Sequence, residues 1–249
     1  MSMQLNDNNN NNNNDSNHLK KISQHYYSNP LPEVSLTAFV LGIIGGISIP
    51  FLFKINFWSL PMYIIFISFF HFFEYYITAR FQPDKVTVES FVIRNGNAYF
   101  FAHSIALIEY LIEYYFYSNF KLNNSFIFNF IKFSGLILTI FGQFLRSGAM
   151  ITAGESFSHI IAQNKLENHK LITFGIYKYF RHPSYVGFFY WALGTQLLLL
   201  NPISTLLFIV LLYKFFSSRI IYEEHKLIEF FGDEYIKYSQ TTPVGIPFL

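Results

Sequence analysis

The sequence has no cysteine, and this absence excludes disulfides, a thiolate nucleophile and any cysteine-ligated metal, whichever compartment the protein faces. Charged residues are also scarce, at 13% of the 249 residues against roughly 25% in soluble domains, whereas 52% are hydrophobic. The net charge is only +2, and the basic residues form no stripe that would follow a nucleic-acid backbone. The composition therefore indicates a membrane protein without a nucleic-acid partner.

Two motifs are missing as well. No glycine-rich loop follows a predicted strand, and no acidic residue farther on is placed to bind a ribose. A soluble Rossmann domain is therefore excluded. Clustered histidine boxes are also absent, although His71 with Glu74, and Glu109 with Glu113, each share a helix face. A di-metal site stays open as an alternative. Because the ligands are so few, we favour interhelical hydrogen bonding for these side chains and predict no metal site.

The N-terminal segment is polar and contains an uninterrupted asparagine tract from Asn8 to Asn14. It has no apolar periodicity with which to build a core, so we predict a disordered tail over residues 1–25 and a membrane-embedded domain over residues 26–249. No compact apolar stretch with a small-residue cleavage site follows a basic start, so we expect insertion through the first spanning helix and not through a signal peptide.

Long apolar segments follow, and a helix needs about 20 largely uncharged residues to cross the ~30 Å hydrocarbon layer. Four such segments lie near Val34–Phe53, Leu60–Ile77, Ala98–Phe116 and Phe126–Leu145. A further block, Tyr185–Phe216, is long enough for two spans and is interrupted at Asn201-Pro202, where proline disfavours helix. The apolar pattern is continuous and does not alternate. It predicts an all-α polytopic membrane bundle of about six helices, which ends in a helical hairpin.

Basic residues are distributed unevenly between the loops. Those before the first span, between the second and third, and after the fourth are Lys20, Lys21, Arg80, Lys85, Arg94, Lys165, Lys170, Lys178 and Arg181. Only Lys54 and Lys121 fall in the opposite loops. The positive-inside rule then places both chain ends and the polar segment after Leu145 in the cytosol.

That polar segment leads directly into the C-terminal hairpin. Its polar side chains are Gln163, His169, Tyr177, Arg181, His182 and Ser184. Pro183 is typical of the first turn of a helix, so Arg181 and His182 would lie at a helix N-terminus, where anionic groups are favoured. Taken singly, each of these residues is more often a packing or surface residue. Their concentration predicts a cofactor pocket at the cytosolic face of the bundle.

A second pair of charged residues follows the hairpin. Arg219 and Glu223 are four residues apart and therefore share a helix face. They fit an ordinary ion pair, or an arginine that reaches the lipid headgroups. Alternatively, Arg219 meets a carboxylate substrate while Glu223 meets a cation.

The order of these motifs resembles the isoprenylcysteine carboxyl methyltransferase family. The matching elements in the C-terminal half are Arg181-His182-Pro183-Ser184-Tyr185-Val186-Gly187, Gly194-Thr195-Gln196, Glu223-Glu224, Leu227-Ile228, Phe230-Phe231-Gly232, Glu234-Tyr235, Tyr238 and Pro243. The resemblance extends backward through Gly142, Leu145-Arg146, Ala149-Met150, Thr152-Ala153-Gly154, Phe157, His159 and Gln163, and more loosely to His71 and Glu74-Tyr75. The chain departs from animal members by a shorter membrane N-terminus and by its asparagine-rich tail.

The resemblance implies an enzyme of the endoplasmic reticulum membrane that transfers a methyl group from S-adenosylmethionine to the C-terminal carboxylate of S-prenylated cysteine. Its partners would be prenylated CaaX proteins such as small GTPases, together with membrane lipid. The residues that would surround the cofactor are Gln163, His169, Lys170, Leu171, Ile172, Tyr177, His182, Pro183, Ser184, Tyr185 and Glu223. Arg219 would be the catalytic residue that binds the substrate carboxylate.

Other classes remain open at this point. The short Arg-His-Pro-x-Tyr element also resembles membrane sterol reductases that use NADPH, and phospholipid methyltransferases share parts of the pattern. A transporter or channel with the same spans would use Glu109 and Glu113 as its ion pathway, but these residues lie away from the polar segment. The full set of motifs favours the carboxyl methyltransferase.

Overall fold

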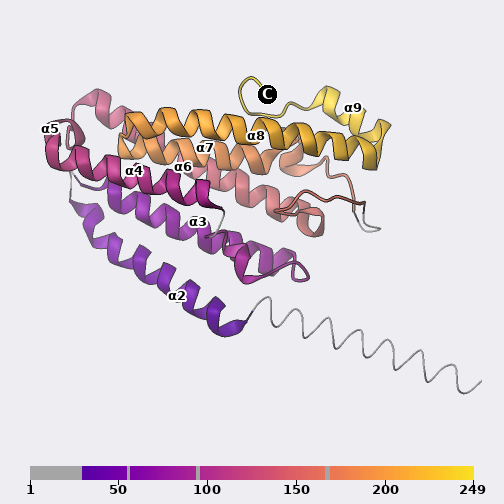
Figure 1. Cartoon of the computed structure of the whole chain (residues 1–249), viewed down its shortest axis with the longest axis horizontal. Helices are drawn as coiled ribbons and strands as arrows, with labels where there is room; N and C mark the ends of the chain where they lie inside the picture. Colours follow the sequence, from indigo (N-terminus) through magenta and orange to yellow (C-terminus); the bar gives the residue numbers. More distant parts are fainter. Residues whose placement is uncertain (1–29, 55–56, 94–95, 166–168) are drawn as a thin grey trace, which may run out of the picture.

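The computed structural model of the chain describes residues 30–54, 57–93, 96–165 and 169–249. The predicted asparagine-rich tail lies outside these ranges, as do Lys20, Lys21 and Arg94. Within the described ranges the regular structure is entirely helical. The long helices run side by side along the long axis of the molecule, and α2 diverges from the others at one edge (Figure 1).

The bundle is built from long helices joined by short connections. The long helices are α2 (Leu31–Ser48), α3 (Ser59–Phe81), α4 (Asn97–Phe116), α6 (Phe126–Ala153), α7 (Pro183–Leu199) and α8 (Pro202–Phe231). The short helices are α5 (Ser118–Lys121) and α9 (Asp233–Thr241), and single 3-10 turns occur at Ile49–Phe53, Val88–Phe91, Gly154–Ser156 and Gly175–Lys178. The predicted break at Asn201-Pro202 is confirmed, because α7 ends and α8 begins there.

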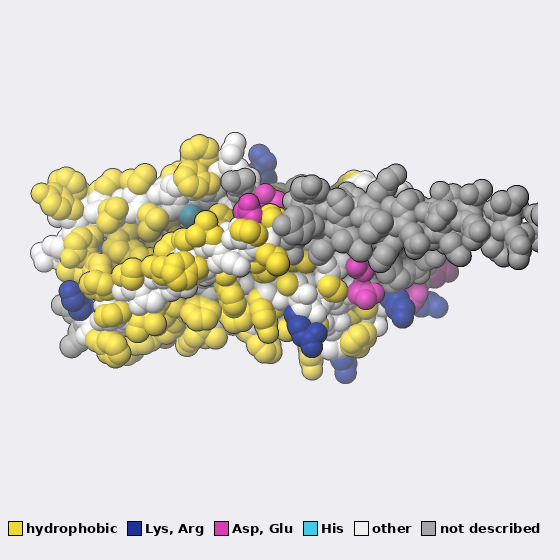
Figure 2. Space-filling model, turned by 90° about the horizontal axis from the view of Figure 1, so that it is seen from below, with side chains coloured by type: hydrophobic (Ala, Val, Ile, Leu, Met, Phe, Trp, Pro, Cys, Tyr) yellow, Lys and Arg dark blue, Asp and Glu magenta, His cyan; other side chains and the backbone are white. Residues whose placement is uncertain are grey.

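The bundle exposes an apolar surface over most of its length. By length and composition, the helical segments Leu31–Phe53, Ser59–Phe81, Phe126–Ser156 and Pro202–Phe231 can cross a membrane. Their outward side chains are large and apolar, such as Phe144 at 69% exposure. One face of the molecule is accordingly covered by hydrophobic side chains, and charged groups are concentrated toward one end (Figure 2). Such a surface suits contact with lipid.

Two helices run farther than the hydropathy predicts. The fourth apolar segment was expected to end at Leu145, yet α6 continues to Ala153 and carries Arg146 inside the helix. Helix α8 continues past Phe216 to Phe231. Arg219 and Glu223 therefore lie on the same helix that crosses the bundle. The ends of both helices therefore project together into the polar region.

Helices α6 and α7 approach each other closely enough to exclude side chains. A Cβ atom added at Gly142 would stand 2.3 Å from the backbone nitrogen of Trp191, and one added at Gly187 would stand 2.5 Å from that of Arg146. Contacts of this kind repeat at Gly135 and Gly194. In membranes, small residues let helix backbones meet in this way. The interface fixes the start of α7, and hence Ser184 and Tyr185, relative to Arg146.

The end of the bundle near α5 contains a polar network. Both carboxylate oxygens of Glu109 accept backbone N–H groups at the start of α8, from Ile203 at 2.8 Å and Ser204 at 2.7 Å. The fully buried Lys121 donates to Glu113 Oε2 at 2.5 Å and to Asn201 Oδ1 at 2.8 Å. Glu109 therefore caps a helix N-terminus, as carboxylates do.

Candidate active site

A cleft of about 690 Å³ opens where α6 ends and α7 begins. The loop between these helices, the last turns of α8, and α9 form its walls. Its lining includes all but one of the predicted cofactor residues, namely His169, Lys170, Leu171, Ile172, Tyr177, His182, Pro183, Ser184, Tyr185 and Glu223. Pro183 is the first residue of α7, as predicted, so the helix N-terminus points into this cleft. The structure thus brings the predicted residues into one site.

Gln163 is the predicted cofactor residue that lies outside this cleft. Its side-chain oxygen accepts a hydrogen bond from the Tyr222 hydroxyl at 2.6 Å, and the residue is exposed. Tyr222 precedes Glu223 on α8, so this bond holds the loop beside the cleft. In this geometry Gln163 contacts the wall of the site from outside.

Three residues that line the cleft carry a side-chain polar atom that is buried without a hydrogen-bond partner. The atoms are Oε2 of Glu223, Nδ1 of His169 and the hydroxyl oxygen of Tyr235. Nδ1 of His182 is 3.7 Å from the Glu223 oxygen, beyond hydrogen-bond distance. Buried polar groups are almost always paired, so these atoms mark places where a polar ligand can bind.

Burial favours the neutral form of two ring side chains of the cleft. The pKa of His169 is lowered by burial, and the nearby Lys85 and Lys165 lower it further. Burial raises the pKa of Tyr177, and Glu223 raises it further. Near neutral pH both rings therefore present uncharged donors or acceptors, and Glu223 supplies the negative charge.

The neighbouring Glu224 has a different role from Glu223. Its Oε1 accepts hydrogen bonds from Arg181 Nε at 2.5 Å and from His182 Nε2 at 3.1 Å. The Arg181 backbone N–H also donates to the carbonyl of Pro243 at 3.0 Å. Glu224 therefore holds the residues before α7 against α8, and the Arg181 backbone holds them against the C-terminal segment. Glu223 is left as the carboxylate that faces the cleft.

A second, larger cavity of about 1230 Å³ adjoins the first. Phe157, Ser158 and Tyr185 line both cavities and form the shared wall. Arg219 lines only the second, where its Nε donates to the Tyr185 hydroxyl at 2.8 Å and its NH2 group donates to the His159 carbonyl at 2.5 Å. The hydroxyl and the carbonyl hold the guanidinium at the boundary between the cavities.

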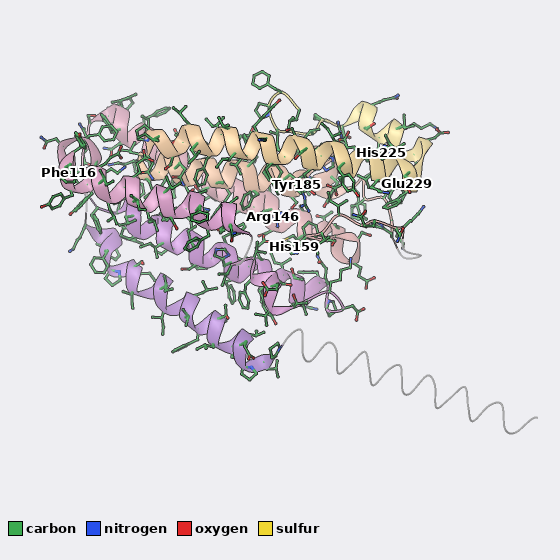
Figure 3. The ribbon with its side chains drawn as sticks, in the orientation of Figure 1. Phe116, Arg146, His159, Tyr185, His225 and Glu229 are labelled. Carbon is green, nitrogen blue, oxygen red and sulfur yellow. The ribbon has the colours of Figure 1, made fainter. Side chains whose placement is uncertain are left out.

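A buried charge pair that was not among the predicted site residues supports this boundary. Arg146 donates to both oxygens of Glu74, at 2.7 and 2.8 Å, and to the Ser184 hydroxyl at 2.5 Å. His159 Nε2 lies 2.9 Å from the same Glu74 carboxylate. Arg146, His159 and Tyr185 lie close together in the middle of the molecule, far from Phe116 at the other end (Figure 3). The sequence signal for this pair was limited to one acid, Glu74, inside an apolar segment, because the predicted fourth segment ends one residue before Arg146.

Internal pairing also occupies acids of α3 and α4 that are candidate ligands of a di-metal site. Glu74 is bound by Arg146, and Glu109 caps α8, so neither carboxylate is available as a ligand. In the part of the chain that the structure describes, no group of three or more histidine, aspartate or glutamate residues is placed to hold a metal ion.

Comparisons with known proteins agree with this geometry. A model described as the isoprenylcysteine carboxyl methyltransferase (ICMT) family matches residues 135–229, which run from α6 to the end of α8. The chain is 49% identical over 222 residues to the protein-S-isoprenylcysteine O-methyltransferase of Saccharomyces cerevisiae, across 89% of this chain and 93% of that protein. It is 36% identical over 224 residues to the Homo sapiens protein of the same name, across 90% and 77%.

The fold is also similar to a solved structure of the eukaryotic intramembrane Ras methyltransferase ICMT. The TM-score is 0.82 at 32% sequence identity, and the match covers 95% of this chain and 85% of that chain. These matches do not support a sterol reductase or a phospholipid methyltransferase. The chain therefore belongs to the isoprenylcysteine carboxyl methyltransferase family, and it is a membrane-embedded methyltransferase.

Proposed function

We propose that this chain transfers a methyl group from S-adenosylmethionine to the C-terminal carboxylate of S-prenylated cysteine and so forms a methyl ester. Its substrates are prenylated CaaX proteins, such as small GTPases. One observation carries the proposal. Arg219 and Glu223, one helical turn apart on α8, line two adjacent cavities that share a wall. A single turn of helix thus presents a cation to one cavity and a carboxylate to the other.

The smaller cavity fits S-adenosylmethionine. The unpaired oxygen of Glu223 suits an amino or sulfonium cation, and His169 Nδ1 offers a further polar partner. The N-terminus of α7, at Pro183, favours the ligand's carboxylate. When bound, S-adenosylmethionine supplies an electrophilic methyl group on a sulfonium.

The larger cavity fits a prenylated carboxylate. The guanidinium of Arg219 suits the carboxylate, and the aromatic side chains of Phe70, Phe188 and Phe216 line the part of the cavity that enters the bundle. Each methylene of a prenyl chain contributes about 0.8 kcal/mol to membrane partitioning, so the substrate arrives through the lipid phase. The polar cofactor enters from water.

The chemistry requires placement more than proton transfer. A carboxylate is already ionised near neutral pH, so the protein needs no general base. Arg219, held by the Tyr185 hydroxyl, orients the carboxylate toward the shared wall. Correct alignment of two bound reactants is worth up to ~7–11 kcal/mol in ideal cases. Exclusion of water from the boundary favours a reaction in which opposite charges neutralise each other.

The proposal includes the membrane in which the protein lies and the side that its site faces. The proposal is a bundle of about six spans, with the site at the cytosolic face of the endoplasmic reticulum membrane. The site end of the described chain carries Lys165, Lys170, Lys178 and Arg181, whereas Lys54 and Lys121 belong to the opposite loops. The positive-inside rule supports this orientation.

The proposal is tested with membranes or purified protein supplied with methyl-labelled S-adenosylmethionine and N-acetyl-S-farnesylcysteine. We expect a labelled product that releases methanol in base, as a methyl ester does. Failure to form this ester, with NADPH consumption when a sterol is supplied, would overturn the assignment in favour of a reductase.

A further inference from the structure

The C-terminal end of α3 contains a glutamine whose side chain is buried with an unused donor. Gln82 is only 2% exposed. Its backbone is satisfied, because its N–H donates to the Thr78 carbonyl at 2.8 Å and its carbonyl accepts from the Lys85 N–H at 2.9 Å. Its side-chain Nε2, however, has no hydrogen-bond partner. Burial of an amide in this state is unfavourable unless a ligand supplies the acceptor.

This donor belongs to the larger cavity, the one that contains Arg219. Gln82 is among its lining residues, with Thr78, Lys85 and Ser90 beside it. These neighbours are already engaged within the protein. Thr78 donates to the Glu74 carbonyl, Lys85 donates to the Glu155 and Phe157 carbonyls, and Ser90 accepts from the Thr87 N–H. On this wall the Nε2 of Gln82 is left for a molecule in the cavity.

The chemistry of a prenylated C-terminal cysteine offers two acceptors. This step rests on the proposed function. One acceptor is the ionised carboxylate, which a guanidinium such as Arg219 matches in charge. The other is the carbonyl of the peptide bond that joins the cysteine to the rest of the protein. A neutral amide N–H suits a neutral carbonyl, and it pairs with that carbonyl without adding charge to the cavity.

We propose that Gln82 Nε2 donates a hydrogen bond to the carbonyl of the last peptide bond of the substrate. The α3–α4 loop thereby distinguishes a prenylcysteine joined through an amide from a prenyl thioether that carries only a carboxylate. The aromatic part of the cavity accepts the lipid of either molecule, so the distinction depends on Gln82.

The test compares two substrates on the purified full-length enzyme. N-acetyl-S-farnesylcysteine carries the amide carbonyl, and S-farnesyl-3-thiopropionate keeps the lipid and the carboxylate but lacks the amide. Gln82→Met preserves the length of the side chain and removes the donor. We expect it to raise KM for the acetylated substrate roughly three- to tenfold, as the loss of one neutral hydrogen bond does, and to raise KM for the thiopropionate much less.

Gln143→Met is the matched control. Gln143 also carries a buried side-chain atom without a partner, its Oε1, but it lines a different, lipid-facing groove between α3 and α6. The ratio of the two KM values should be unchanged in this variant. If Gln82→Met does not accumulate, Gln82→Leu also removes the donor without adding charge to the cavity, and the same ratio is measured within that single protein.

The outcomes separate the possibilities. A selective loss on the acetylated substrate supports the proposal. An equal loss on both substrates, or no loss on either, overturns it, because Gln82 would then meet the carboxylate, shape the cavity or contact nothing. A wild-type enzyme that methylates neither substrate would instead contradict the proposed function itself.

Discussion

Both ends of the bundle hold acidic side chains on long apolar helices, yet the two ends differ in how those acids are satisfied. At the α5 end, both oxygens of Glu109 accept backbone donors from α8. At the opposite end, Glu223 retains a buried oxygen without a hydrogen bond, and it faces a cleft. An acid that is satisfied within the protein stabilises the bundle. One that is left unpaired beside a cavity marks the place where a ligand binds.

The strongest challenge to this comparison is the removal of Arg219, because its guanidinium has the substrate carboxylate as its proposed partner. We expect Arg219→Ala to lower kcat/KM for N-acetyl-S-farnesylcysteine by roughly 100-fold or more, the loss typical of truncating one partner of a buried charged pair. The amount of protein in membranes should stay near normal. Lys214→Ala, an exposed change on the same helix, serves as the control. Loss of folded protein in proportion to activity would make Arg219 a structural residue.

Substitution of Glu223 is a more selective test of the end of the bundle where a carboxylate oxygen has no hydrogen-bond partner. Glu223→Gln keeps the shape of the side chain but removes a charge-assisted hydrogen bond worth about 1.5–3 kcal/mol, so the affinity for S-adenosylmethionine should fall roughly 10- to 150-fold. The KM for the lipid substrate at saturating cofactor should change much less. Glu229→Gln is a suitable control, since Glu229 is exposed on the same helix and pairs with Lys226 at 2.8 Å. A defect confined to the lipid substrate would mean that the ligand has been misassigned.

Substitution of Glu109 tests the opposite end of the bundle, where the carboxylate is hydrogen-bonded within the protein. Glu109→Gln removes the negative charge that caps α8, so we expect a loss of stability of about 1–2 kcal/mol, seen as a lower melting temperature in detergent. At temperatures where the variant stays folded, both KM values should match those of the wild type. A changed cofactor affinity in a fully folded variant would break the distinction between the two ends, and would revive an ion pathway through Glu109.

Of these substitutions, Gln163→Ala should have the smallest effect on the kinetic constants. The resemblance implies that Gln163 contacts the cofactor. In the structure its side-chain oxygen instead accepts a hydrogen bond from the Tyr222 hydroxyl at 2.6 Å, outside the cleft. We therefore expect Gln163→Ala to change the KM for S-adenosylmethionine by no more than about twofold, the scale of an exposed substitution. A loss as large as that of Glu223→Gln would show that the loop closes over the cofactor.

Hydropathy predicted much of the fold, because a helix in lipid must satisfy its backbone internally and so requires a continuous apolar run. Pro183 likewise predicted the start of α7 from local chemistry alone. The continuation of α6 through Arg146 was not predicted. Its charge is neutralised by Glu74, which is 72 residues earlier in the chain, and a local pattern contains no trace of that partner.

The proposed cofactor cleft was more predictable than the larger cavity. Most residues of the cleft come from one continuous segment and the nearby end of α8, so their concentration in the sequence was visible. The larger cavity combines Gln82 from the end of α3 with Phe188 from α7 and Arg219 from α8. Only the packing of the bundle brings these three residues together.

The most direct measurement is the dissociation constant of S-adenosylmethionine for the wild type, Arg219→Ala and Glu223→Gln, determined by calorimetry on purified protein. Arg219 lines only the larger cavity and Glu223 only the smaller of these two, so their effects should separate. We predict near wild-type affinity for Arg219→Ala and a roughly 10- to 150-fold weaker affinity for Glu223→Gln. Equal weakening by both changes, or weakening by Arg219→Ala alone, would contradict the assignment of one reactant to each cavity.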